Sequence, residues 1–152
     1  MTEKDIPPCL IYIDKEGRWF HKGAEMIHRE IIRHLYEHME IDPRGRYIID
    51  LRGDRCYVDV EDVPFIIRRT VLKVTDQAGN SRIILYLSDD GQEDLSPETL
   101  YVGNDNVIYC RVKGGAFPAR FSRAAYYQLA EYIEEENERY YLPLNGKKCF
   151  IA

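Results

Sequence analysis

Apolar side chains recur along the chain with two different spacings, and each spacing predicts a different kind of element. Around residues 15–17, two runs rich in β-branched and aromatic residues are separated by charge and glycine, which predicts two strands joined by a turn. From residue 26 to residue 40 the apolar positions are four residues apart, which predicts an amphipathic helix. The predicted buried stripe of this helix comprises Ile27, Ile31, Leu35 and Met39, with Ile32 beside them.

The rest of the chain predicts strands and one further helix. Asp42-Pro43 ends the first helix, because proline cannot continue it. Ser122 is a suitable N-cap for a second helix that buries Leu129 and runs to about Asn137. Between the helices, turn residues at 76–80 and apolar runs predict a central antiparallel β meander. Its strands are expected at residues 55–60, 65–74, 82–87 and 107–112, after a strand at residues 46–51.

A short sequence motif occurs twice and suggests that the two halves of the chain are related. RYIIDLRG begins at Arg46 and RYYLPLNG begins at Arg139, and the two predicted helices can be aligned with Leu35 on Leu129. This order predicts one hairpin-helix-strand unit used twice in an α+β fold of two small subdomains. Chance similarity between two α+β segments is the alternative.

The subdomains are expected at residues 1–60, a hairpin, a helix and strands, and at residues 61–152, a mostly β, roll-like meander closed by a helix. We expect both helices to cover a shared β layer. A cleft is expected where the two subdomains meet.

Charge and composition narrow the class of partner. The formal net charge is −5 and the isoelectric point is about 5.4, so we expect no nucleic-acid partner, because such binding needs many Lys and Arg side chains on one face. Neither a signal peptide nor an apolar run of about eighteen residues is present, which predicts a cytoplasmic protein without a membrane partner. The four cysteines lie far apart in apolar runs, which is typical of reduced, buried thiols rather than disulfides: Cys9, Cys56, Cys110 and Cys149.

Few residues suggest catalysis or metal binding. His34 and His38 are four residues apart, but no third ligand accompanies them at a suitable spacing, so we expect no metal. A capping or packing role is expected for His28. The chain has no G-x-S-x-G elbow, no phosphate-binding glycine loop and no H-E-x-x-H motif. We therefore expect no cofactor and assign no catalytic residue.

Charges of alternating sign follow the predicted strands between residues 50 and 69. Cross-strand ion pairs are the simpler interpretation. The functional interpretation is that arginines converge on a groove and bind an anionic ligand, because arginine forks match carboxylate and phosphate groups. Neighbouring strand residues point to opposite faces, so only one of Arg68 and Arg69 would join such a cluster, and one of Trp19 and Phe20 would stay exposed. The candidate ligand-binding residues are Trp19, Phe20, Arg52, Arg55, Asp62 and Arg68.

Four runs of the sequence, taken in order, resemble the bacterial domain-of-unknown-function family 1285: GRWFHKGAEMIHREIIRHL, GRYIID, VDVEDVPF and VIYCRVKGGAFPARFSRAAYYQLAE. The likeness extends from about Trp19 to Tyr132. It implies a two-part α+β fold with related motifs in its halves, a cytoplasmic location and a signalling or regulatory role. It implies no established activity and no catalytic residue. The Arg68-Arg69 strand departs from the family pattern.

Three hypotheses about function follow from these observations. The first is a non-enzymatic binding or signalling module that takes a small anionic ligand or a protein partner in the cleft. The second is a hydrolase or transferase in which clustered carboxylates act as acid and base, and it requires at least one of them to be buried with a raised pKa: Asp59, Glu61 and Asp62. The third is a structural homodimer joined through the edges of its sheets.

Overall fold

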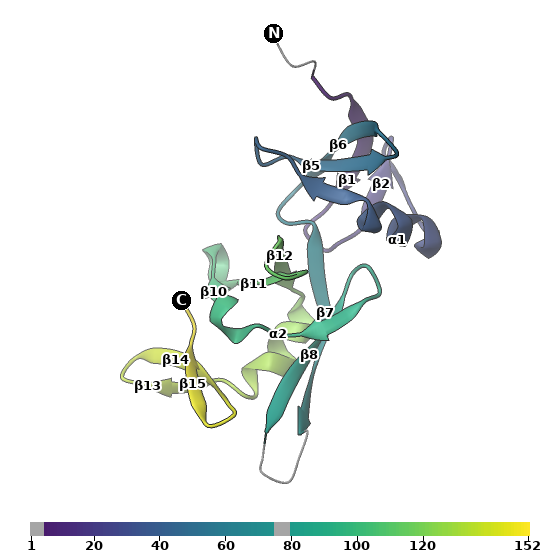
Figure 1. The fold of residues 1–152 in the computed structure, drawn as a ribbon. Helices are drawn as coiled ribbons and strands as arrows, with labels where there is room; N and C mark the ends of the chain where they lie inside the picture. Colours follow the sequence, from purple (N-terminus) through teal and green to yellow (C-terminus); the bar gives the residue numbers. More distant parts are fainter. Residues whose placement is uncertain (1–4, 75–79) are drawn as a thin grey trace. The chain divides into compact units, whose positions relative to one another are not determined.

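The structure of the chain, a computed structural model, describes residues 5–74 and 80–152. The chain divides into two compact units, residues 1–64 and 65–152, where the sequence predicted limits of 1–60 and 61–152. Within the described residues each unit contains one α-helix and one six-stranded sheet, and the second unit adds a three-stranded sheet (Figure 1). The predicted α+β fold of two small subdomains is confirmed. The turn predicted at residues 76–80 lies, apart from Asn80, outside the described residues.

The first unit is a mixed sheet with one helix. Its elements are β1 (Pro8–Ile13), β2 (Trp19–His21), β3 (Ala24–Glu25), α1 (Arg29–Glu37), β4 (Met39–Ile41), β5 (Tyr47–Leu51) and β6 (Asp54–Val60). The strands lie in the order β3-β2-β1-β6-β5-β4. Neighbouring strands are antiparallel except β1 and β6, which run parallel and so join the hairpin to the β4–β6 meander.

The second unit contains a six-stranded and a three-stranded sheet. Its first strands are β7 (Phe65–Val74), β8 (Ser81–Leu87) and β9 (Gln92–Asp94), which form an antiparallel meander. Of the strands expected in the central meander only β7 and β8 are neighbours, because β6 lies in the sheet of the first unit. The 3₁₀ turn η1 (Pro97–Thr99), β10 (Tyr101–Val102), the 3₁₀ turn η2 (Asn104–Asn106), β11 (Ile108–Val112) and β12 (Phe117–Phe121) follow. The six-stranded sheet has the order β10-β11-β12-β7-β8-β9, with β12 parallel to β7.

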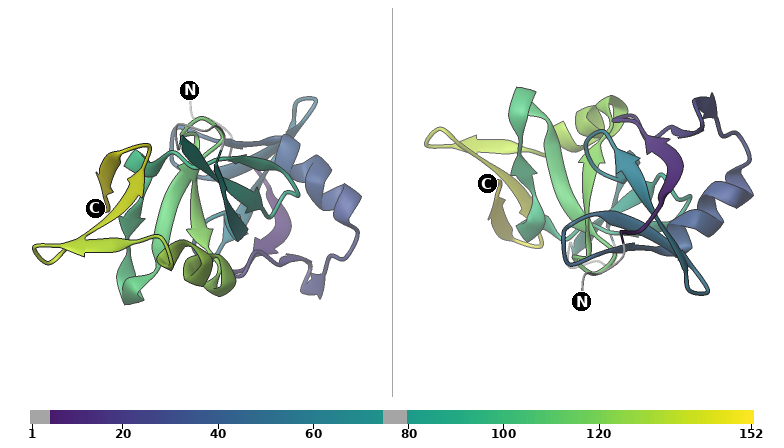
Figure 2. Two further views of the ribbon diagram at one scale, coloured as in Figure 1. Left: turned by 90° about the horizontal axis from the view of Figure 1, so that it is seen from below. Right: turned by 90° about the horizontal axis from the view of Figure 1, so that it is seen from above.

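The chain ends with a helix and a separate small sheet. The helix α2 (Arg123–Ala130) begins at the predicted cap, because the Ser122 hydroxyl accepts a hydrogen bond from the backbone N–H of Ala125 at 3.1 Å. The prediction that it continues to Asn137 is wrong, because β13 (Glu134–Glu136) occupies those residues. β14 (Arg139–Leu144) and β15 (Lys147–Phe150) complete the sheet, and Figure 2 shows β13 and β14 extending away from the rest of the second unit.

Both units contain the same order of elements. A hairpin, a helix and a three-stranded meander follow one another as β1–β2, α1 and β4–β6, and again as β11–β12, α2 and β13–β15. The two copies of the short sequence motif form β5 and β14. The pairing differs, because the first meander joins its hairpin through β1 and β6, whereas the second forms a sheet of its own. The units therefore have separate sheets, and the shared β layer that we expected under both helices is not formed.

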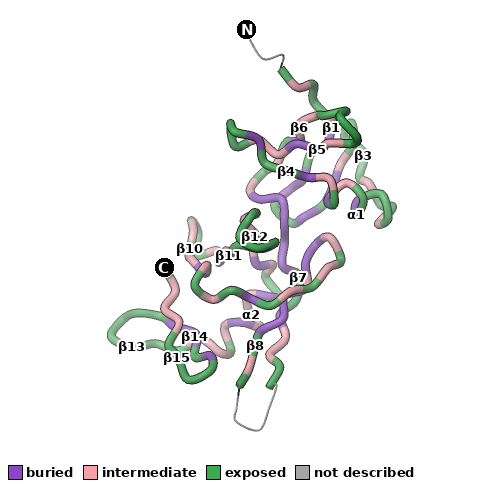
Figure 3. Tube along the Cα trace, in the orientation of Figure 1, coloured by how far each residue is buried: buried purple, intermediate pink, exposed green. Residues whose placement is uncertain are grey.

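The helix α1 is shorter than predicted, and only part of its predicted stripe is buried. Its buried residues are Ile32 and Tyr36. Ile27 is 74% exposed, Ile31 is 50% exposed and Leu35 is half-buried, whereas Met39 is buried in β4. Figure 3 shows both buried and exposed stretches in α1. The four-residue apolar spacing was correctly taken as a helix, but its buried side is turned toward Ile32 and Tyr36.

Tyr36 explains which side of α1 faces inward. Its ring lies edge-on to the ring of Trp19, with centroids 4.7 Å apart. Its hydroxyl donates a hydrogen bond to the backbone carbonyl of Pro64 at 2.7 Å. The hydroxyl group of a buried tyrosine needs a hydrogen-bond partner. The spacing of apolar residues along the chain does not show where that partner lies.

The first unit contains two copies of a five-residue turn, Asp-x-x-Gly-Arg, at residues 14–18 and 42–46. In the first copy, Asp14 Oδ1 accepts hydrogen bonds from the backbone N–H groups of Glu16 and Arg18 at 3.0 and 2.8 Å. Its Oδ2 accepts from the Arg18 Nε at 2.7 Å. Gly17 has a φ of 83°, a conformation that glycine adopts without strain. One aspartate therefore fixes both the turn and the arginine that follows it.

Cys9 and Cys56 form a disulfide, so the expectation of four reduced thiols is wrong. The two residues lie on β1 and β6, with Cα atoms 4.9 Å apart and a separation of 47 residues in the sequence. Their proximity follows from the parallel pairing of these strands, which spacing along the chain does not show. Cys110 and Cys149 are free, and burial raises the pKa of the Cys110 thiol to about 12.

The Asp14 turn predicts that the folding stability of the protein decreases at acidic pH. Burial opposes ionisation of Asp14, but hydrogen bonds from Arg18 and Glu16 and the charge of Arg18 hold its pKa below the ordinary value. Because the folded-state pKa is lowered, the contribution is present above the ordinary pKa of about 3.9 and is lost as the pH falls through the folded-state value.

We therefore expect Asp14→Asn to lower the free energy of unfolding by about 1–3 kcal/mol at neutral pH. The difference from wild type should shrink below about pH 4. Denaturant unfolding at a series of pH values measures it. The exposed Asp59→Asn serves as the control, and a deficit in Asp14→Asn that is the same at every pH would contradict the assignment.

The disulfide predicts a redox-dependent stability of the first unit. Opening the Cys9–Cys56 bond frees a loop of the unfolded chain, so reduction should lower the free energy of unfolding by about 2–4 kcal/mol. Cys9→Ser should show the same loss without reductant and no further loss with it. Cys149→Ser is the matched control. Equal stability of the oxidised and reduced proteins would contradict the prediction.

Candidate functional site

The predicted arginines of the first unit do not converge on a groove. Arg55 lies on β6, where its Nη2 donates a hydrogen bond to Glu40 at 2.7 Å and its Nε lies 3.6 Å from Asp50, its register partner on β5. Arg52 is exposed in the β5–β6 turn with a φ of 56°. Arg55 therefore forms ion pairs with neighbouring strands, as the simpler interpretation of the alternating charges predicted.

Arg68 belongs to the second unit. Its guanidinium lies 3.8 Å from Asp90, and the neighbouring Arg69 lies over the ring of Tyr86 at 4.6 Å. Both arginines are exposed, and the register of β7 on β8 shifts between Ile67 and Arg69. A bulge of this kind interrupts the regular alternation of strand faces, on which the expectation for this pair rested.

None of the clustered carboxylates is buried. Asp59 and Glu61 are exposed, and Asp62, between β6 and β7, is half-buried. Glu61 accepts a hydrogen bond from the backbone N–H of Lys15 at 2.9 Å. The hydrolase or transferase hypothesis requires at least one buried carboxylate, and Asp62 is only half-buried.

Trp19 and Phe20 have different environments. Trp19 is buried in the core of the first unit, whereas Phe20 is half-exposed and its ring centroid lies 6.1 Å from that of Tyr12. Phe20 lines a groove of about 450 Å³ formed where β1 bulges, and Leu10 in that bulge has a φ of 62°. The groove is lined by Leu10, Ile11, Tyr12, Phe20, Lys22, Gly23 and Asp59.

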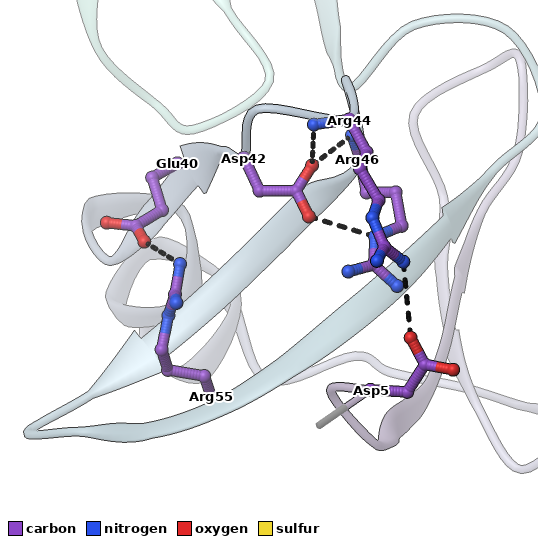
Figure 4. A network of polar contacts seen from close by, with 6 residues as sticks. All are labelled: Asp5, Glu40, Asp42, Arg44, Arg46 and Arg55. Carbon is purple, nitrogen blue, oxygen red and sulfur yellow. Dashed lines mark hydrogen bonds and ion pairs between the residues drawn. The ribbon is translucent and has the colours of Figure 1, made fainter. Parts of the chain in front are cut away.

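A second pocket of the first unit contains two arginines that the sequence reading did not select. It has a volume of about 520 Å³ and lies beside the second Asp-x-x-Gly-Arg turn (Figure 4). Arg44 and Arg46 come from this turn, and Tyr57 comes from β6. The backbone N–H of Tyr57 donates to the carbonyl of Pro7 at 3.0 Å, which holds the opposite wall. The lining residues are Asp5, Ile6, Pro7, Pro8, Arg44, Arg46 and Tyr57.

Asp42 fixes Arg46 in this pocket. Its Oδ1 accepts hydrogen bonds from the backbone N–H groups of Arg44 and Arg46 at 3.0 and 2.8 Å, and its Oδ2 accepts from the Arg46 Nε at 2.9 Å. Burial opposes ionisation of Asp42, but the hydrogen bonds and charge of Arg46 lower its pKa, so the carboxylate stays charged. The guanidinium carbon of Arg46 lies 5.9 Å from the centre of the Tyr57 ring. Among residues 5–74 and 80–152, Asp42 engages Arg46 through its Nε, which leaves the two terminal nitrogens of the fork for a ligand.

Arg44 has a weaker partner. Its Nη1 lies 3.2 Å from Asp5, but the side chains are 57% and 81% exposed. Exposed ion pairs of this kind contribute little to stability, so an anion in the pocket can replace Asp5. The pocket therefore offers one preorganised arginine and one exchangeable arginine to a negatively charged group.

The sequence did contain a signal for this pocket. Residues 42–45 were interpreted only as the end of a helix, although Asp42-x-x-Gly45-Arg46 repeats Asp14-x-x-Gly17-Arg18. Comparing the two copies would have singled out Arg46 as an arginine held by an aspartate. The position of Tyr57 beside it follows from strand pairing alone.

Comparisons with known proteins agree with this fold. No protein-family model matches the sequence, and no curated protein matches it. Among solved structures, the chain is similar to a DUF1285 family protein from Silicibacter pomeroyi, with 15% identity, a TM-score of 0.78, and coverage of 95% of this chain and 79% of that protein. This chain has the DUF1285 fold. The predicted resemblance to family 1285 is thus confirmed at the level of structure.

A second DUF1285 family protein, from Shewanella baltica, matches with 15% identity and a TM-score of 0.64. The match covers 80% of this chain and 91% of that protein. Identity this low shows the shared fold and carries over no DUF1285 site residue to this chain. The candidate site is therefore argued from its own side chains.

Proposed function

We propose that the chain is a non-enzymatic binding or signalling module whose first unit takes a small anionic group between Arg44 and Arg46. The observation that carries the proposal is a pair of guanidinium groups from one turn, one of which is held by the buried Asp42 and lies beside Tyr57. Planar guanidinium forks match the oxygens of carboxylates and phosphates. The signalling part of the proposal rests on the resemblance to family 1285 and on the shared fold.

The geometry favours a small group over an extended polyanion. A volume of about 520 Å³ is within the range of small-ligand pockets, and two arginines suit one carboxylate or phosphate. Because Asp42 already orders Arg46, binding loses less side-chain freedom at this position. The same chemistry suits a free anion and an anionic side chain on a protein partner, so both are included in the test.

The two other hypotheses have less support. A carboxylate acid/base pair is less favoured, because Asp59 and Glu61 are exposed and Asp62 is half-buried. Dimerisation through sheet edges is also less favoured, because the edge strands of the six-stranded sheets have only two or three residues each. Short edges offer few backbone groups to a second copy.

We also propose a cytoplasmic location. No helix among the described residues is long and apolar enough to cross a membrane. The Cys9–Cys56 disulfide is unusual for this location, because glutathione and thioredoxin keep most cytosolic cysteines reduced. The proposal therefore predicts that Cys9 and Cys56 are reduced in the cell.

Titration with inorganic phosphate, succinate and a phosphorylated peptide, followed by backbone amide NMR shifts, tests the anion pocket. We expect shifts around residues 42–46, with Arg44→Ala and Arg46→Ala each weakening affinity about tenfold, because each removes a charge-assisted hydrogen bond. Asp5→Asn should strengthen binding, since it removes the competing carboxylate. Phosphate or succinate binding supports a free anion, whereas binding of the peptide alone supports a protein partner.

The repeated turn provides a matched control for this experiment. Arg18 has the same contacts in its own Asp-x-x-Gly-Arg turn but does not line the pocket, so Arg18→Ala should leave affinity unchanged. Arg55→Ala removes an arginine of the same unit that pairs with Glu40. The proposal fails if the wild-type protein binds no probe, or if these two variants weaken binding as much as the pocket variants.

Thiol labelling tests the location. If the chain is cytoplasmic in its native cell, alkylation before lysis should modify Cys9 and Cys56 in most molecules, as read by mass spectrometry. Free Cys149 provides the labelling control, since it forms no disulfide. Protection of the pair with labelling of Cys149 would indicate an oxidising compartment and overturn the cytoplasmic proposal.

A further inference from the structure

The carboxyl end of α1 carries a cluster of metal-ligating side chains that the sequence reading dismissed. His34, Glu37 and His38 lie within one turn of the helix, and their donor atoms are all within 4.8 Å of one another. The sequence reading found no third ligand for the histidine pair. Glu37 is that third group, three residues after His34 and directly before His38.

The direction of the helix core explains why these side chains gather at the surface. With about 100° per residue, His34 lies roughly opposite the midpoint of the buried Ile32 and Tyr36, and Glu37 and His38 flank it at about 60° and 40°. The earlier core direction, based on Leu35, would have placed the histidines at the edge of a buried face. His34 and Glu37 are exposed and His38 is half-buried, so a hydrated ion can reach all three.

The distances fit one shared ion after small side-chain rotations. The imidazole rings of His34 and His38 have centroids 4.6 Å apart. Donor atoms on one tetrahedral zinc ion lie about 3.3 Å apart, because each Zn–N bond is about 2.0–2.1 Å. Exposed side chains three and four residues apart on a helix can make this approach without moving the backbone.

The backbone beneath the cluster is anchored, and its electrostatics favour a cation. The N–H of His38 donates to the carbonyl of Leu35 at 3.2 Å, and the carbonyl of His38 accepts from the N–H of Asp50 on β5 at 3.1 Å. This end of α1 is therefore tied to the sheet. The unsatisfied carbonyl groups at a helix carboxyl terminus carry partial negative charge, which attracts a positive ion.

We propose that His34, Glu37 and His38 form a site for a divalent transition-metal ion, zinc above all. Two imidazole nitrogens and one carboxylate oxygen suit zinc, nickel and copper, whereas magnesium and calcium prefer oxygen ligands alone. Three protein ligands leave a fourth position of a tetrahedral ion for water. Among the described residues, no other group of three His, Cys, Asp or Glu side chains comes as close together.

The order of the residues, H-x-x-E-H, also occurs in one class of zinc peptidase. In such helical zinc motifs two histidines bind the ion and the glutamate acts as a base. Here a carboxylate oxygen of Glu37 lies within 4.8 Å of a ring nitrogen of both histidines, so we assign Glu37 as a ligand. The proposal concerns metal binding and includes no peptidase activity.

Isothermal titration of zinc chloride into the tag-free, oxidised protein at neutral pH tests the site. We expect one ion per chain, with His34→Ala and His38→Ala each weakening affinity by about tenfold or more and Glu37→Gln weakening it less. Copper should bind more tightly than zinc, and magnesium should not bind. Cobalt binding should give visible absorption bands of a low-coordinate site, and these should disappear in His34→Ala.

Matched variants separate the site from nonspecific binding. His21→Ala removes an exposed histidine on β2, Glu30→Gln removes an exposed carboxylate of the same helix, and Cys149→Ser removes a free thiol. All three should keep wild-type affinity and stoichiometry. The proposal is overturned if the wild-type protein binds no zinc, or if a folded His34→Ala/His38→Ala variant, checked by circular dichroism, binds it as tightly.

Discussion

The parallel pairing of β1 with β6 makes the first unit a single sheet, and most of its distinctive features depend on it. The pairing joins the amino-terminal hairpin to the β4–β6 meander. It brings Cys9 within disulfide distance of Cys56, and it places the Pro7 carbonyl where it accepts a hydrogen bond from the Tyr57 N–H. The pocket of Arg44 and Arg46 has its second wall only because of this register. In the second unit the corresponding hairpin pairs with β7 instead, and its meander forms a separate sheet.

The two Asp-x-x-Gly-Arg turns show how a buried charge organises a local structure. In each turn one aspartate accepts two backbone hydrogen bonds and one from an arginine side chain, so the negative charge is fully compensated while it is shielded from water. This compensation lowers the pKa of Asp14 and Asp42 despite their burial. It also orients Arg18 and Arg46. The two turns differ in their surroundings, because Arg46 lines one of the described pockets and Arg18 lines neither.

The helix α1 illustrates how one tertiary contact changes the chemistry of an entire face. Tyr36 packs on Trp19 and donates to the Pro64 carbonyl, and this contact turns the helix so that Ile32 is buried and Ile31 is exposed. The opposite face then presents His34, Glu37 and His38 to solvent. The exposed Ile27 and Ile31 lie outside this cluster.

The sequence by itself determined most of the element types and the α+β class, because apolar spacing, turn residues and helix caps act over a few neighbouring residues. The Ser122 cap and the strand at Arg46 are examples of such local signals. Only the tertiary structure decided which strands pair across long separations, as for Cys9 and Cys56, and which side of α1 faces inward. These features depend on contacts between residues far apart in the chain. Spacing alone does not show whether Leu35 or Tyr36 faces the core.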